Sequence, residues 1–76
     1  MEQEYTVTLY WDDEASVWIA TSEDIYGLIL EHESFDFLIQ RVRLAIPELL
    51  AFDESSFANI SIDFAVLRKE KLALNG

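Results

Sequence analysis

The stretch SEDIYGLILEHES (residues 22–34) decides how the rest of the chain can fold. Segments with strand periodicity precede it, and a segment with helical periodicity follows it. The stretch itself holds four carboxylates, the single histidine and the first glycine of the chain. These residue types could form an acidic site, or they could mark a joint between two kinds of structure. The flanking patterns help to separate the two interpretations.

Two strands are predicted upstream of this stretch. In YTVTLYWDD (residues 5–13), Tyr5, Val7, Leu9 and Trp11 alternate with Thr6, Thr8 and Tyr10. A period of two among β-branched and aromatic residues indicates a strand with one core face. The polar residues 12–16 have the length of a hairpin connection. VWIATS (residues 17–22) alternates again, so the two segments are expected to form an antiparallel hairpin.

The stretch is then predicted to turn, to form a short third strand and to start a helix. Gly27 can adopt a positive φ angle at low cost, which suits a turn over residues 22–27. LILEHE (residues 28–33) returns to an extended pattern. Ser34 is a favourable N-cap, and apolar residues recur at three- and four-residue spacing from Phe35 to Leu50. Pro47 is expected to kink or break this helix near its end.

One further strand completes the predicted α+β order β-β-β-α-β. Residues 51–59 are expected to form a loop or a short helical turn, and ISIDFAVLR (residues 60–68) alternates as a fourth strand. Residues 68–76 are expected to be a frayed tail. A right-handed crossover through the helix would place the fourth strand parallel to a hairpin strand, giving a mixed four-stranded sheet. The helix would cover one sheet face, and Tyr10, Trp18 and Leu67 would lie on the bare face.

Length and composition predict a single domain over residues 1–76. A chain this short buries only about 60–65% of its unfolded surface, so its stability margin is small. The apolar share of 51% favours self-association as a homodimer or a higher homo-oligomer. The chain has no cysteine, no apolar run long enough to span a membrane and no signal-peptide pattern at its start. A cytoplasmic location is therefore expected.

The charge distribution excludes one class of partner and favours another. Fifteen Asp and Glu residues outnumber five Lys and Arg residues, and the net charge is −10. All five basic residues follow position 40. This field repels nucleic acid and attracts a basic protein. The other interpretation left open is that the acidity only maintains solubility.

Catalytic and metal sites are weakly supported by the sequence. Asp12, Asp13 and Glu14 could hold a hard cation, but their spacing is not that of a calcium loop, and a solvated hairpin turn is favoured. Asp12, Asp24 and Glu31 could in principle form a two-metal nuclease site. His32 has no evident catalytic partner and is expected at the surface. No P-loop, Rossmann or nucleophile-elbow pattern is present. No catalytic, cofactor-binding or metal-ligating residue is predicted.

Residues 11–50 resemble a known family in the order of several motifs. The features in common are an extended segment ending in acidic residues, the pattern VW.A.S.DI.GL..E, a helix that begins after a small polar residue, and the sequence PELL. This combination resembles the N-terminal domain of HicB-type antitoxins, and more closely a small family of uncharacterised bacterial domains grouped with them. The family usually has proline where this chain has Tyr26. The C-terminal DNA-binding module typical of these antitoxins is not expected here, because about ten residues follow the fourth strand.

The resemblance implies a partial ribonuclease-H-like fold without the catalytic carboxylates of the nuclease. It also implies a role in neutralising a small basic, RNA-cleaving toxin. Our first hypothesis is therefore a non-catalytic binding module for a basic protein. The alternatives are a divergent metal-dependent nuclease and a purely self-associating domain. The residues predicted to contact a partner are Asp12, Asp13, Glu14, Trp18, Glu23, Asp24, Tyr26 and Glu31.

Overall fold

The computed structural model describes residues 3–50, 60–68 and 72–74. Within these residues it contains, in chain order, β1 (Gln3–Asp12), β2 (Val17–Thr21), β3 (Ile29–His32), α1 (Phe35–Leu49) and β4 (Ile60–Leu67). The predicted α+β order is confirmed. The connection expected at residues 51–59 lies outside the described residues, as does most of the expected tail.

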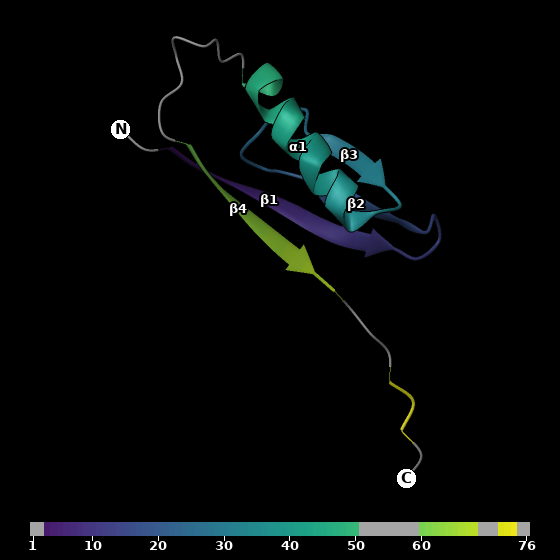
Figure 1. Cartoon of the computed structure of the whole chain (residues 1–76). Coiled ribbons are helices and arrows are strands. Elements are labelled where there is room, and N and C mark those ends of the chain that lie inside the picture. Colours follow the sequence, from purple (N-terminus) through teal and green to yellow (C-terminus); the bar gives the residue numbers. More distant parts are fainter. Residues whose placement is uncertain (1–2, 51–59, 69–71, 75–76) are drawn as a thin grey trace.

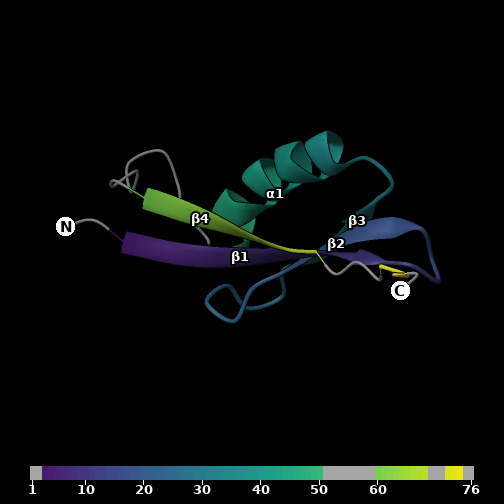
Figure 2. The same cartoon turned by 90° about the horizontal axis from the view of Figure 1, so that it is seen from below.

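The four strands form one mixed sheet in the order β3-β2-β1-β4 (Figure 1). β1 and β2 are antiparallel, as are β2 and β3, whereas β4 runs parallel to β1. The parallel pair is the crossover arrangement that the sequence predicts. Helix α1 packs on one face of this sheet over β2 and β3 (Figure 1). On the other side, the edge-on view shows the β2–β3 connection but no helix (Figure 2).

The core lies between the sheet and α1 and includes two residues of the opening stretch. Its fully or almost fully buried side chains are Val7, Leu9, Ala20, Ile25, Leu28, Leu38, Val42 and Ile46. Ile25 and Leu28 come from the β2–β3 connection rather than from a strand or helix. The connection is therefore an integral part of the core, and its position determines how the helix can dock.

Helix α1 begins where the sequence predicts and continues past the expected break. The Ser34 hydroxyl accepts a hydrogen bond from the Phe37 amide at 3.4 Å, which makes Ser34 the N-cap. Of the kink or break expected at Pro47, the break does not occur, because α1 extends to Leu49. Pro47 lies in the last turn, where a missing amide removes only one hydrogen bond. The Leu50 amide still donates to the Ile46 carbonyl at 2.9 Å and closes that turn.

The two tryptophans differ from the prediction, Trp18 in its sheet face and Trp11 in its exposure. Trp18, expected on the bare face, pairs with Trp11 across the hairpin on the same face as the buried Ala20. Its ring lies 5.0 Å from that of Phe35 in an edge-to-face contact, so it packs against the core. Trp11 lies on the predicted core face with Leu9, but it is 40% exposed because it lies near the end of β1. Its indole N–H donates to Asp13 at 3.0 Å.

We expect Ser34→Ala to lower the free energy of unfolding by about 1 kcal/mol, because the Phe37 amide loses its acceptor. Ser34→Asp keeps an acceptor at the same position and serves as the control. Urea unfolding followed by circular dichroism measures both changes. Equal stability of the alanine variant and the unchanged chain would contradict a contribution from this cap.

Candidate functional site

Within residues 3–50, 60–68 and 72–74, no helix covers the sheet face that points away from α1, and we call this face the open face. The pairing registers assign its members, because side chains alternate between the two faces along every strand. Its residues are Glu4, Thr6, Thr8, Tyr10, Asp12, Val17, Ile19, Thr21, Ile29, Glu31, Ser61, Asp63, Ala65 and Leu67. None of these described residues is Lys or Arg.

An apolar row crosses the middle of the open face. Leu67 pairs with Tyr10, Tyr10 with Ile19, and Ile19 with Glu31, so these four side chains lie in one line across the sheet. Leu67 is 61% exposed, and Tyr10 is also exposed. The row ends in the carboxylate of Glu31. It therefore combines apolar contact area with a negative charge at one side.

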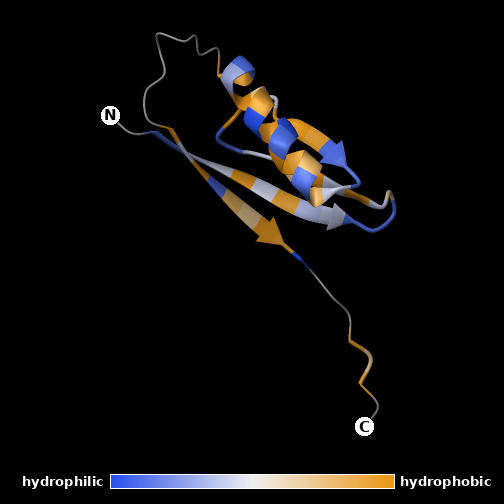
Figure 3. Cartoon of the chain, viewed as in Figure 1, coloured by the Kyte–Doolittle hydropathy of each residue, from blue (hydrophilic) through white to orange (hydrophobic). Residues whose placement is uncertain are grey.

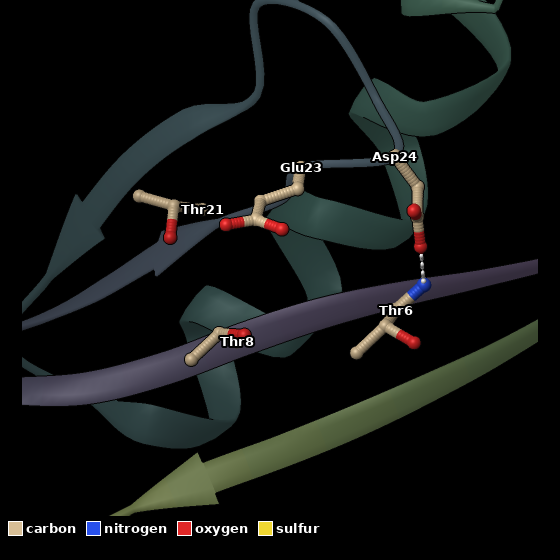
Figure 4. A pocket seen from close by; sticks show the side chains of 5 residues that line it. All are labelled: Thr6, Thr8, Thr21, Glu23 and Asp24. Carbon is tan, nitrogen blue, oxygen red and sulfur yellow. Dashed lines mark hydrogen bonds between the residues drawn. The ribbon is translucent and has the colours of Figure 1, made fainter.

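A polar hollow of about 410 Å³ adjoins this row (Figure 4). Thr6 and Thr8 from β1, Thr21 from β2, and Glu23 and Asp24 from the β2–β3 connection line it. Hydroxyl and carboxylate oxygens dominate this lining. Such a lining suits a hydrogen-bond donor, and a cationic one most of all.

One wall of the hollow forms just beyond the end of the β1–β2 backbone pairing. There, side chains make the hydrogen bonds to β1 that a strand backbone would otherwise make. Backbone pairing of β1 with β2 runs from Asp12 to Thr8 and then stops. At Thr6, the Ser22 hydroxyl donates to the carbonyl at 2.6 Å, and the amide donates to Asp24 Oδ2 at 2.7 Å. Two side chains thus satisfy the Thr6 groups that a β2 residue would otherwise pair. Figure 4 shows the Asp24 contact.

The same Ser22 hydroxyl also organises its own connection. It accepts hydrogen bonds from the Asp24 amide at 3.0 Å and the Ile25 amide at 3.1 Å. A serine that accepts from following amides forms a local turn. This turn directs Ile25 into the core while Glu23 and Asp24 stay beside the open face.

A second turn follows at once and exposes Tyr26. The Leu28 amide donates to the Ile25 carbonyl at 3.3 Å, and Gly27 has a φ of +86° at the third position, as in a type II turn. The predicted positive φ at Gly27 is confirmed. A Cβ at Gly27 would stand 3.5 Å from Leu49, so the turn lies against the end of α1. Tyr26 is 97% exposed at the tip.

The residues predicted to contact a partner divide between two ends of the sheet. Asp12, Asp13 and Glu14 lie at the β1–β2 turn, whereas Glu23, Asp24 and Tyr26 lie at the β2–β3 connection. Asp24 contacts Thr6 on β1. Thr6 is six residues from Asp12 on the same strand, so the two carboxylates are roughly 20 Å apart along β1. Glu31 lies on the open face between these ends, and Trp18 lies on the opposite face.

Hydrogen bonds already engage some of these carboxylates. Asp12 Oδ1 accepts from the amides of Glu14 at 3.0 Å and Ala15 at 3.3 Å, which forms the expected hairpin turn. Asp24 is engaged with Thr6 as described above. Sequence reasoning missed Thr6, Thr8, Thr21 and Asp63, although their alternation with buried residues indicates the open face.

The separation of the carboxylates does not fit the two-metal arrangement. Asp12 and Asp24 lie far apart along β1, and Glu31 lies two strands away, about 10 Å across the sheet. Two-metal chemistry needs carboxylates around ions about 4 Å apart. Among residues 3–50, 60–68 and 72–74, no group of three His, Cys, Asp or Glu side chains is placed to hold a metal ion.

His32 has a structural contact rather than the simple surface position expected. It is half-buried on the helix side, and its Nδ1 accepts a hydrogen bond from the Ser34 amide at 2.8 Å. Its ring lies 5.3 Å from that of Phe37. The histidine therefore helps to fix the chain between β3 and the helix N-cap.

Comparison with known proteins assigns the chain to a family. Residues 4–73 match the family described as a domain of unknown function, DUF1902. The chain belongs to this family. Membership of DUF1902 agrees with the expected resemblance to a family of uncharacterised domains. Comparison with curated proteins gives no match.

A solved structure resembles this DUF1902 chain along nearly its whole length. It is a hypothetical protein, TTHA1013, from the extremely thermophilic bacterium Thermus thermophilus. The two chains are 27% identical, with a TM-score of 0.66, and the alignment covers 93% of this chain and 99% of the other.

In the described part of the present chain, no helix is long and apolar enough to cross a membrane.

We expect Ser22→Ala to lower the free energy of unfolding by about 1–2 kcal/mol, because the Thr6 carbonyl and the Asp24 and Ile25 amides lose one shared partner. Ser22→Thr retains the hydroxyl and is the matched control. Urea unfolding measures both variants. A loss in the threonine variant as large as that in alanine would show that the hydroxyl is not the cause.

We expect Tyr26→Pro to raise the free energy of unfolding by about 0.4–1 kcal/mol, because proline restricts the unfolded chain at the second position of a type II turn. The turn hydrogen bond comes from the Leu28 amide and is retained. Thermal unfolding measures the change, with Tyr26→Ala as the control for loss of the exposed ring. A lower stability in the proline variant would contradict this turn geometry.

Proposed function

We propose that this DUF1902 domain is a non-catalytic protein-binding module that binds a small basic protein through its open face. The observation that supports this most directly is the composition of that face. An apolar row is bordered by carboxylates, and no described strand residue on the face is basic. Surfaces of this kind combine apolar contact area with selection by charge.

The overall charge supports the choice of a basic partner. A net charge of −10 on 76 residues produces a field that accelerates encounter with a cationic protein and repels nucleic acid. Of the described cationic residues, Arg41 and Arg43 belong to α1, and Arg68 lies just beyond the end of β4. Among the described residues, the strands therefore contribute acidic side chains and no basic ones to the open face.

The hollow gives this surface a specific point of recognition. A Lys or Arg side chain of the partner could place its charged end among the oxygens of Thr8, Thr21 and Glu23. Its methylene stem could lie along the apolar row beside Tyr10. Glu23 makes the stronger charge contribution, since Asp24 already accepts from the Thr6 amide.

The resemblance of residues 11–50 to HicB-type antitoxins suggests which basic protein to test. We propose that the partner is a small RNA-cleaving toxin, whose cationic RNA-binding surface would be covered by the open face. The matching test is coexpression of this chain with candidate small basic toxins in a growth assay. Rescue of growth by the chain supports the antitoxin role, and failure with every toxin encoded in the source genome contradicts it.

Binding to a toxin identified in this way is expected to weaken roughly tenfold in Glu31→Lys, because the charge at the end of the apolar row is reversed. Glu48→Lys carries the same charge change on α1, away from the open face, and serves as the matched control. Isothermal titration at low and high salt measures both. The difference is expected to shrink at high salt, where exposed charges are screened.

Equal weakening by the two variants would show that net charge alone drives binding. That outcome would contradict the assignment of the binding surface to the open face. Unchanged affinity in both variants would contradict electrostatic recognition altogether.

A further inference from the structure

The outer edge of β4 is one of the two edges of the sheet that the described strands form. The strand order places β4 at one end of the sheet, where β1 pairs with its inner side over all eight residues. No strand among residues 3–50, 60–68 and 72–74 pairs with its outer side. Proteins usually protect such edges with proline, lysine or a very short strand. Residues 60–67 contain neither proline nor lysine, and Asp63 is their one charged residue.

The other edge of the sheet, β3, is shorter than β4 and is covered by α1. β3 is four residues long, and α1 packs over it. β4 is twice as long, and α1 lies over β2 and β3 instead of over it (Figure 1). The β4 edge is therefore the one that offers a long row of backbone donors and acceptors to another chain.

Apolar side chains accompany this edge on both faces of the sheet. Val66, on the helix side, is 48% exposed, and Leu67, on the open face, is 61% exposed. Leu72 and Leu74 are exposed beyond the strand. Figure 3 shows apolar residues at the end of β4 and again in the segment that follows it. A small domain with a thin core gains stability when such surface is buried in an interface.

We propose that the β4 edge pairs antiparallel with the β4 edge of a second copy, so that two chains share one continuous sheet. The pairing is self-complementary: a two-fold axis perpendicular to the sheet carries each β4 onto the other. Both helices then lie on one side of the shared sheet, and both open faces lie on the other. The inference is independent of the identity of any basic partner.

Charge complementarity favours a second copy over a basic protein at this edge. Antiparallel pairing places the C-terminal end of one β4 beside the N-terminal end of the other. Arg68 directly follows β4 at that C-terminal end. At the N-terminal end, Glu4 of β1 pairs with Ser61. The two-fold axis therefore brings each Arg68 toward the end of the sheet that carries Glu4 of the other copy, whereas a basic partner would bring like charge to Arg68.

The first test is the mass of the chain in solution, measured by light scattering over a range of concentrations. We expect twice the 8.8 kDa mass of one chain. Val66→Lys combined with Leu67→Lys should raise the dimer dissociation constant about tenfold or more, because lysine disfavours edge pairing. These changes make the chain less negative, so general charge repulsion cannot account for dissociation. A monomer in the unchanged chain would overturn the proposal.

A matched control separates the edge from other exposed apolar residues. Ile29→Lys combined with Leu44→Lys adds the same charge at residues that are each 75% exposed, on β3 and on α1. We expect this control to remain a dimer. Dissociation of the control to the same extent, or a dimer that survives the two β4 lysines, would overturn the assignment to β4. Circular dichroism checks that both variants are folded.

Single-cysteine cross-linking tests the antiparallel geometry without relying on destabilising changes. The chain has no cysteine, so each residue from 62 to 67 can be replaced in turn. A residue near the two-fold axis faces its own copy, at a Cα separation that a disulfide can span, about 4–7 Å. We expect fast cross-linking at one such position and slow cross-linking at the control Leu44→Cys. Rates no faster than the control at every β4 position would overturn the proposal.

Discussion

The Ser22 hydroxyl bonds three backbone groups and joins β1 to the β2–β3 connection, and the rest of the fold depends on that junction. It donates to the Thr6 carbonyl on β1 and accepts from the Asp24 and Ile25 amides in its own connection. Asp24 completes the junction by accepting from the Thr6 amide. Together these bonds continue the β1–β2 pairing with side chains where backbone pairing ends. The chain can then leave the sheet, place Ile25 in the core and return as β3.

The same junction shapes the surface on which function is proposed. It holds the β2–β3 connection beside the open face, where Glu23 and Asp24 line the hollow. Carboxylates that look alike in the sequence have different roles in the structure. Asp24 is committed to the backbone of β1, and Asp12 to the hairpin turn. Glu23 and Glu31 are both exposed beside the open face and make the larger contribution to the field that a partner would meet.

Local patterns predicted most of the fold. The alternation in β1 and β4, the N-cap at Ser34 and the positive φ at Gly27 are each determined by neighbouring residues. The bonds of Ser22 and Asp24 reach Thr6 across 16 and 18 residues, so no local pattern contains them. The sheet face on which Trp18 lies is set by its pairing with Trp11. The aromatic character of Trp18 alone does not determine that face. The effect of Pro47 depends on its distance from the helix end. The sequence predicts the open face as a bare surface, but its hollow arises only when the connection folds back on β1.

The central claim is that side chains complete the sheet at Thr6, and amide hydrogen exchange at that residue tests it most directly. The account predicts that the Thr6 amide is protected to a degree similar to the Thr8 amide, which lies where backbone pairing with β2 continues. It also predicts that Asp24→Ala accelerates exchange at Thr6 much more than at Thr8, whereas Asp24→Asn, which keeps an acceptor, has a smaller effect. A Thr6 amide that exchanges as fast as the exposed Tyr26 amide in the unchanged chain would contradict the account.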